Sequence, residues 1–534
     1  MRVGRTIFLI LAILMMVSVK TAPVRAASIL GDDWEKFFRD RVSFGGFLEN
    51  VTGLSIAAGD SKFTTSNRFI MNRLTFQPEF NVDFNEQLRF FISWRFAKEP
   101  RYNKEAKDRR RSTPPFPPLD NTFYDEDSFK PWEMVIDIKP TDRLKLRWGR
   151  QFISWGETDG LRLLDVINPQ DGTFPPPLTP NLFNLDETRI PSWGLRSFYT
   201  FNPATNTTLE LIAMPGFDEK KKRVDELAPI AGRWAPHPET RIRLGRLFAD
   251  PVGPIPVVIP DIQQEFPDAG DNWKLGGRIT HTFGRLSAGI GYLWGYNPQA
   301  GDMVLKKTGA PSLTTCPFPP FLVLCTQVKL KLINDRTSIY AAHFNYSLEE
   351  PWKTAIRGEL AFYPSKPYNI SQYPGSTGLK AGPDPKHSNT DIVEKNTLRY
   401  SLGFDRPTLI PFLHPDDPWR AFNLSLQIFQ SIILDHEDGI RAFASAEKIH
   451  KVSTSLTFRI GTGYFGDTIL PDVFVAYDPL GYWSANPALS YVPPWNEKIR
   501  FTLTAALYGG RNKFGSLGVF SEKDSVFLKI RYQL

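Results

Sequence analysis

Runs of about ten residues in which apolar and polar side chains alternate strictly are the feature that most constrains this chain. One run sets the apolar Leu74, Phe76, Phe80, Val82 and Phe84 against the polar Arg73, Thr75, Gln77, Glu79, Asn81 and Asp83. A period of two places successive side chains on opposite faces of a strand. Such runs exceed the five or six residues typical of soluble strands. They match the length that a tilted strand needs to cross a bilayer.

The same alternation recurs along the whole chain. It is found in 88–96, 132–148, 193–211, 275–294, 340–362, 398–404, 422–428, 452–460, 499–507 and 526–534, and more weakly in 42–50, 468–478 and 483–492. Short connectors alternate with long ones rich in Pro, Gly and charge, which cover 97–131, 156–191, 215–272, 295–327 and 363–394. Short periplasmic turns and long extracellular loops are the layout of outer-membrane barrels. We therefore predict an all-β, antiparallel transmembrane barrel of about 18 strands, within a range of roughly 16 to 20.

A soluble β-sandwich is the alternative fold, since its strands also alternate. Aromatic residues make up 13% of this chain, and a Trp or Tyr lies near many predicted strand ends. In a barrel these rings form the two interfacial girdles, whereas a sandwich has no need of them. The final stripe of Val526, Leu528, Ile530, Tyr532 and Leu534 resembles the closing strand of bacterial outer-membrane barrels, although those usually end in Phe. We expect recognition by the barrel-assembly machinery and contact with outer-membrane lipid.

The N-terminus indicates the compartment. Arg2 and Arg5 precede the apolar stretch 6–19, and a small-x-small exit follows at Val24-Arg25-Ala26, which is the pattern of a secretory signal peptide. The stretch is shorter than the ~20 residues of a membrane helix. We expect a signal peptide at 1–26, a short periplasmic segment at 27–41 and the barrel at 42–534. Removing the leader lowers the formal net charge from +7 to +3, because it contains four basic residues and no acids. The basic composition is therefore no sign of nucleic-acid binding.

Motifs for cofactor chemistry are missing from the sequence. The seven His form no HxH, HExxH or CxxC-type set, and we find no haem motif or phosphate loop. We therefore expect no metal and no cofactor. Asp435-His436 and His387-Ser388-Asn389 each match a small part of an outer-membrane protease or phospholipase motif. Chance occurrence in surface loops explains both matches better than catalysis.

Cys316 and Cys325 are the two cysteines of the chain, and both fall in the predicted loop 295–327. In a secreted chain a lone pair is expected to form a disulfide, which we interpret as a structural restraint rather than a redox site. The residues between them include Phe318, Phe321 and Leu322, an apolar content unusual for a solvated loop. Two placements explain this: an inward constriction, or packing against a neighbouring loop.

The most distinctive stretch runs from 149 to 171. It contains Gly149, Arg150, Gln151, Trp155, Gly156 and Glu157, followed by Asp165, Asn168, Pro169 and Asp171. It resembles a large family of uncharacterised proteobacterial outer-membrane proteins, which share a GRQ-x-x-x-WGE strand end and a D-V-I-N-P-x-D loop. The runs 477–481 and 487–491 are also similar to that family. The resemblance implies an outer-membrane barrel linked to envelope export of lipid-like or other hydrophobic compounds. Alginate-export porins share a similar GRQ strand, and neither family supplies catalytic residues.

The same stretch has a physical interpretation of its own. Arg150 and Gln151 close a basic strand, and Trp155 lies where that strand leaves the membrane. Glu157, Asp165 and Asp171 follow in a loop that we expect to fold back into the lumen and pair with arginines of the wall. A structural anchor for the loop and a contact with substrate both remain open, and we favour the anchor.

The polar phase of the predicted strands is rich in positive charge. In a barrel this phase faces the lumen. The inward basic residues are Arg73, Arg89, Arg95, Arg143, Lys145, Arg147, Arg196, Lys274, Arg278, Lys329, Lys331, Lys353, Arg357, Arg399, Arg459, Arg500, Lys529 and Arg531. The inward acids are Glu79, Asp83, Glu133, Asp137, Glu210, Glu359 and Asp405. Rings of Arg and Lys favour anions in pores.

Three classes of function remain. We favour a non-enzymatic, porin-like channel for the passage or export of small anionic or amphipathic solutes, narrowed by inward loops. One alternative is an outer-membrane hydrolase on a barrel scaffold. The other is the barrel sheath of a larger envelope export or electron-transfer complex, which would bring envelope components as partners. The sequence leaves the oligomeric state and the solute open.

Overall fold

The computed structural model describes most of the chain. The described residues are 32–57, 69–101, 131–170, 176–183, 185–216, 257–258, 262–264, 273–297, 302, 304–318, 321–333, 336–370, 392–441, 448–511, 517–521 and 523–534. Within these ranges, no helix combines the length and the apolar character that a bilayer-spanning helix requires.

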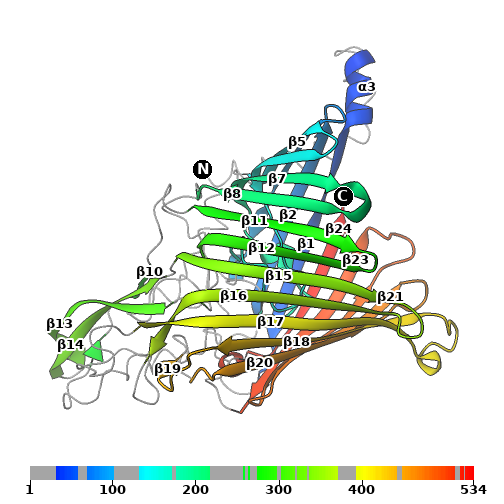
Figure 1. Ribbon diagram of the computed structural model, residues 1–534. Helices are drawn as coiled ribbons and strands as arrows, with labels where there is room; N and C mark the ends of the chain where they lie inside the picture. The colour runs from blue at the N-terminus through cyan, green and yellow to red at the C-terminus, as the bar shows by residue number, and fades with distance from the viewer. Residues whose placement is uncertain are drawn as a thin grey trace.

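An antiparallel sheet closes on itself to form a barrel (Figure 1). The first strand, β1 (Val42–Ser55), pairs with β2 (Phe69–Asp83) on one side and with the last strand, β24 (Ser525–Gln533), on the other. Between them the wall follows chain order through β3 (Leu88–Trp94), β4 (Phe96–Lys98), β5 (Pro131–Thr141), β6 (Leu144–Gln151), β7 (Ser192–Asn202), β8 (Thr207–Met214), β11 (Lys274–Phe283), β12 (Leu286–Tyr296), β15 (Arg336–Leu348), β16 (Thr354–Ile370), β17 (Ile392–Leu409), β18 (Ala421–Ile433), β20 (Val452–Gly461), β21 (Ile469–Asp478), β22 (Tyr482–Tyr491) and β23 (Ile499–Gly510).

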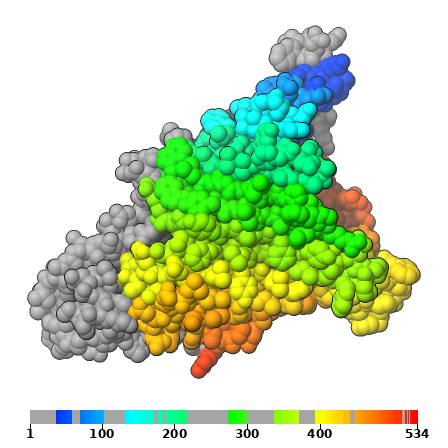
Figure 2. All heavy atoms as spheres, in the orientation of Figure 1, coloured from blue at the N-terminus to red at the C-terminus, as the bar shows by residue number. Residues whose placement is uncertain are grey.

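The number of strands in the wall agrees with the prediction. β3 and β4 both pair with β2 and form one interrupted strand, and β19 (Ile440–Arg441) only extends the end of β16. The closed barrel therefore has 18 strands. Figure 2 shows their sequential order as successive bands of colour across the outer wall. The three weakly alternating segments are also strands, namely β1, β21 and β22.

The two faces of the wall differ as the alternation predicts. Large apolar side chains point outward, for example Ile290 at 65% and Leu503 at 51% exposure. Polar side chains such as Glu359 and Gln427 are buried on the inner side, at 4% and 2%. This inside-out arrangement suits a barrel whose exterior is lipid and whose interior is polar. It confirms the predicted fold class of an all-β, antiparallel transmembrane barrel.

The two ends of the barrel have connections of different length. One end carries short turns, such as the two-residue turn at Gly284-Arg285 and the 3-10 helix η1 (Pro203–Thr205). A second 3-10 helix, η3 (Pro411–Leu413), lies in the turn after β17. The helix α3 (Asp32–Arg41) leads into β1 at this same end (Figure 1). The long connections, including that of η4 (Gly518–Phe520), lie at the other end. We call these the short-turn end and the long-loop end.

A small second sheet lies beyond the long-loop end (Figure 1). The strands β13 (Val304–Phe318) and β14 (Phe321–Ile333) form a hairpin, and β14 also pairs with β9 (Val257–Val258) and β10 (Ile262–Gln264). Cys316 and Cys325 belong to this hairpin, so the expectation of a plain loop is wrong. Runs such as Thr314-Thr315 and Leu322–Leu324 have high strand propensity, which explains the apolar content.

Of the two placements expected for this segment, the inward constriction is wrong, because the hairpin lies outside the barrel (Figure 1). The residues between the cysteines pair within the hairpin, and β9 and β10 join β14 only at 326–327 and 330–332, so packing of the apolar side chains on a neighbouring connection stays a prediction. The backbone register sets Cys316 opposite Val323 and Cys325 opposite Thr314. Their side chains lie outside the described ones, and the disulfide stays a prediction.

Candidate functional site in the lumen

The described parts of the connection between β6 and β7 lie inside the barrel, and we call these residues, 152–170, 176–183 and 185–191, the inward loop. One half buries Ile153, Leu164 and Ile167 in a cluster completed by residues of β8, β12, β15, β16 and β18. The other half buries Leu182 and Phe183 against β1, β2, β23 and β24. These two groups of strands lie on opposite sides of the barrel. The inward loop therefore crosses the lumen.

The GRQ stretch fixes the beginning of the inward loop. Gly149 has a φ of +138°, and an added Cβ would lie 2.0 Å from the carbonyl oxygen of Met134, so the position requires glycine. The Arg150 guanidinium donates to the backbone oxygens of Pro131 (2.6 Å) and Pro191 (3.2 Å). The Gln151 amide donates to the oxygen of Gly194 (2.9 Å).

The next residues of this stretch enter the lumen. Trp155 is 3% exposed, and the Arg278 guanidinium lies 5.5 Å from its ring centroid. Gly156 packs against Asp165, whose backbone nitrogen would be 3.0 Å from an added Cβ. A side chain at this position would require the loop at Asp165 to shift by a few tenths of an ångström.

Asn168 ties the two ends of the inward loop together. Its Oδ1 accepts from the backbone N–H of Ile153 (2.7 Å), and its Nδ2 donates to the oxygens of Gln151 (3.1 Å) and Ile190 (3.0 Å). The oxygen of Pro169 accepts from the N–H of Ile190 (2.8 Å). These contacts support the structural-anchor interpretation of the motif.

The acids of the motif do not pair as expected. Asp165 forms its ion pair with Arg189, which belongs to the loop itself and not to the wall. The Glu157 carboxylate lies 3.9 Å from His343 Nδ1, and its backbone oxygen accepts from Arg357. Asp171 lies outside the described residues. The loop does fold into the lumen, but wall arginines bind other acids.

Asp159 is one acid that the sequence analysis missed. Arg357 on β16 donates to the carboxylates of Asp159 (2.8 Å) and Asp405 (3.0 Å). The Gln427 amide adds a further hydrogen bond to Asp159 (3.1 Å). Beside them the Glu359 carboxylate accepts from two loop N–H groups, those of Glu157 and Leu164. Wall and loop are joined here by ionic and polar contacts.

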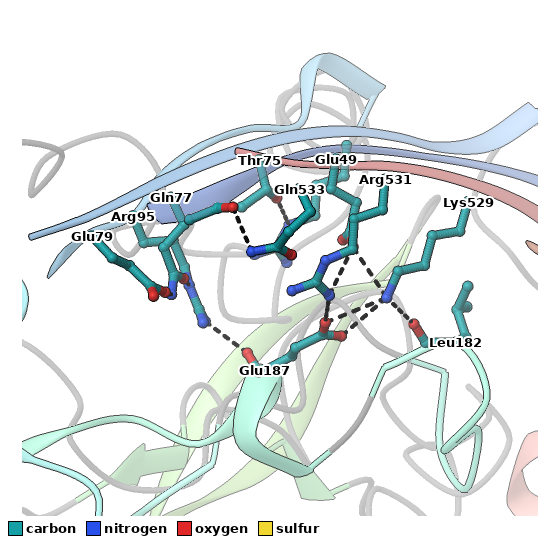
Figure 3. Close-up of polar contacts among 12 residues, drawn as sticks. Glu49, Thr75, Gln77, Glu79, Arg95, Leu182, Glu187, Lys529, Arg531 and Gln533 are labelled. Carbon is teal, nitrogen blue, oxygen red and sulfur yellow. Dashed lines mark hydrogen bonds and ion pairs between the residues drawn. The ribbon is translucent and has the colours of Figure 1, made fainter. Parts of the chain in front are cut away.

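Glu187 makes the corresponding junction on the opposite wall (Figure 3). It lies in α6 (Leu185–Thr188) and contacts Lys529 Nζ (3.2 Å) and Arg531 Nη1 (2.5 Å) of β24. The same two cations reach Glu49 on β1, at 3.1 and 3.5 Å. Arg95 donates to the backbone oxygen of Glu187 (2.7 Å). Burial opposes ionisation most strongly, but Lys529 and Arg531 hold the pKa of Glu187 below its ordinary value.

Most of the predicted basic residues have polar partners. Four carboxylates of the wall form ion pairs with these cations: Asp137 with Arg147 and Lys145, Glu210 with Arg196 and Arg278, Asp472 with Arg459, and Asp83 with Arg89. Two further arginines donate hydrogen bonds to neutral side chains of the wall, Arg73 to Thr75 and Arg95 to Gln77. Loops supply the partners of others. Lys274 donates to the oxygen of Ile167 (2.8 Å), and Arg399 and Lys366 hold Asp302 at 2.5 and 3.2 Å.

Four predicted wall positions are wrong. Lys329 and Lys331 lie in β14, outside the barrel, because the second sheet also alternates. Arg143 and Lys353 lie in turns at the short-turn end, and Lys353 is 2.6 Å from Glu350.

A cavity of about 970 Å³ lies between the inward loop and the short-turn end, and we call it the vestibule. Its acidic lining residues, Asp159, Glu187, Asp405, Asp467 and Asp472, each pair with an Arg or Lys. Two lining arginines, Arg406 and Arg500, are exposed and form no ion pair with any described residue. The vestibule therefore retains positive charge. Among the described residues no group of His, Cys, Asp and Glu is arranged to hold a metal ion.

Comparison with known proteins gives one family and a set of solved structures. A family model described as a protein of unknown function, DUF1302, matches residues 8–223, which supports the expected likeness to an uncharacterised family. No curated protein matches the chain.

Two of the similar structures are Acinetobacter baumannii OccAB3 (8% identity, 92% of this chain, 99% of that chain, TM-score 0.46) and OccAB4 (8%, 92%, 98%, 0.45). A third is Pseudomonas aeruginosa OpdK with vanillate (10%, 93%, 99%, 0.44).

Proposed function

We propose that this barrel is a passive outer-membrane channel for small anionic solutes, including amphipathic ones. The observation that carries the proposal is a closed 18-strand barrel with an apolar exterior, a charged interior and an open, net positive vestibule. A water-filled cavity inside low-dielectric walls concentrates the field of its fixed charges and enriches counter-ions. Arginines that have no acidic partner attract anions in this way.

The inward loop reduces the charge that the wall alone presents. Asp159 and Glu187 from this loop, and Asp302 from another, neutralise cations of the wall at distances of 2.5–3.2 Å. The preference for anions is therefore attributed to the vestibule, where Arg406 and Arg500 remain uncompensated, and not to the whole wall.

The channel itself is tested by reconstitution. The purified protein in planar lipid bilayers is expected to give discrete, long-lived conductance steps. Its heat-modifiable migration on gels checks that the barrel is folded. A folded, inserted barrel that gives no conductance steps would contradict the channel.

The partners follow from the same proposal. They are outer-membrane lipid around the apolar wall and the barrel-assembly machinery during insertion, with envelope export components as further candidates. The hydrolase alternative gains no support: His436 Nε2 contacts the backbone oxygen of Ile449 at 2.7 Å, and His387 lies outside the described residues.

A further inference from the structure

One side of the vestibule places three cations next to one another. The register of β23 and β24 sets Arg500 directly opposite Arg531, and Thr502 opposite Lys529. All four residues line the vestibule. Like charges directly opposite in a sheet are destabilising unless an anion lies between them. Arg531 and Lys529 have carboxylates beside them, but Arg500 has none among the described residues.

The charges at this place do not balance. Arg500, Arg531 and Lys529 face two carboxylates, Glu49 and Glu187, and one positive charge is left over. Glu49 is buried in the wall at 3% exposure. Glu187 is presented by the inward loop and lines the vestibule (Figure 3). Its carboxylate thus occupies the position where a dissolved carboxylate entering the vestibule meets Arg531 and Lys529.

We propose that Arg500, Arg531 and Lys529 form a binding site for a carboxylate-bearing solute, at which Glu187 is the competing internal anion. The inference rests on the proposed channel for access and adds a defined site to it. Guanidinium groups bind carboxylates through paired, charge-assisted hydrogen bonds. Ser490 and Thr502 lie in the same lining and share a hydrogen bond of 2.8 Å, in which one hydroxyl donates to the other, so one hydroxyl hydrogen is left as a further donor.

The lining also indicates what kind of carboxylate fits. Leu470 and Pro471 on β21, and Ala488 on β22 beside β23, are apolar and line the same space. A volume of about 970 Å³ lies at the upper end of the range for small-molecule sites. The site therefore suits an amphipathic carboxylate, with its charged group at Arg500 and its apolar part toward β21 and β22.

The test measures the binding of benzoate and of its uncharged analogue benzamide to the folded, detergent-solubilised protein, by calorimetry or ligand-observed NMR. Arg500→Gln is the test variant. Arg406→Gln is the matched control, because Arg406 also lines the vestibule without an ion pair but lies on β17, separated from β23 by β18, β20, β21 and β22. Benzoate should bind better than benzamide, and R500Q should weaken benzoate binding about tenfold while R406Q changes it less than about threefold.

A third variant tests the competition. Glu187→Gln removes the internal anion with little change in shape and should strengthen benzoate binding several-fold. Equal losses in R500Q and R406Q, benzoate no better than benzamide, or weaker binding in E187Q would each overturn the proposal. Measurements of ion current distinguish this proposal from the proposed channel. Conductance without benzoate binding would overturn the binding site alone, and benzoate binding without conductance would overturn the channel alone.

Discussion

The wall and the vestibule use the same residue types in opposite ways. In the wall, Arg196 and Arg278 share the buried carboxylate of Glu210 at 2.5 and 2.6 Å, and Arg147 holds Asp137 at 2.7 Å. In the vestibule, Arg500 faces Arg531 with no acid of its own among the described residues. The number of inward cations therefore does not by itself determine the ion selectivity of a barrel. Only cations without a fixed partner are available to a solute.

The largest expected effect concerns the wall. Glu210→Gln leaves two arginines without their shared counter-ion, in a place where the carboxylate is 3% exposed and the arginines 15% and 18%. Removing one partner of such a buried group costs about 3–5 kcal/mol. Urea unfolding of the barrel in lipid vesicles should show this loss. A cost below about 1 kcal/mol would mean that the wall arginines are as free as Arg500.

The next effect concerns the anchoring of the inward loop. Asn168 is only 1% exposed, and Asn168→Ala removes three hydrogen bonds of its side chain. Together these hydrogen bonds contribute about 3 kcal/mol. We expect the barrel to stay folded while the loop loosens, which should raise the single-channel conductance and expose the loop to protease. Asn345→Ala is the control, since its side chain makes a single hydrogen bond to the described part of the loop, with Glu157 at 3.5 Å. Equal behaviour of the two variants would contradict the role of Asn168.

A smaller effect depends on pH. The pKa of Glu187 is lowered when the loop is docked, so its contribution to docking is complete above the ordinary value of about 4.5 and is lost only as the pH falls through the lowered pKa. Protease sensitivity of the loop should therefore be constant from pH 7 to pH 5 and rise below about 4.5. E187Q should abolish this rise. A Glu187-dependent transition above pH 5 would contradict the ion pairs with Lys529 and Arg531.

The smallest effect on stability is expected in the vestibule. Arg500→Gln removes an exposed cation that has no ion pair among the described residues and lies opposite a like charge. The free energy of unfolding of the R500Q variant should differ from that of the wild type by less than about 0.5 kcal/mol. The same urea titration measures it beside E210Q, and a loss comparable to that of E210Q would erase the distinction between wall and vestibule.

Local pattern predicted the wall because a period of two can be recognised without knowing any neighbour. It even located β1, β21 and β22, where the alternation is weak. The acids at Glu157, Asp165 and Asp171 predict a loop that folds into the lumen, but they do not predict which residues of the wall the loop contacts. Glu187 and Lys529 are 342 positions apart, and such a contact depends on closure of the whole barrel.

The outer hairpin was missed for a different reason. The stretch 328–332 of β14 alternates like the strands of the wall, and this pattern predicts a lumen position for Lys329 and Lys331. Strand propensity in β13 and β14 was a usable signal for a hairpin. Periodicity alone does not distinguish a strand of the barrel from a strand beside it.

The reversal potential in a KCl gradient across a planar bilayer tests the central claim most directly, because it measures the charge that the lumen presents to ions. We expect an anion-selective potential for the wild type and a shift of this potential toward zero when Arg406 and Arg500 are both replaced by Gln. A cation-selective wild type, or a double variant with unchanged selectivity, would show that these two arginines do not set the selectivity of the channel.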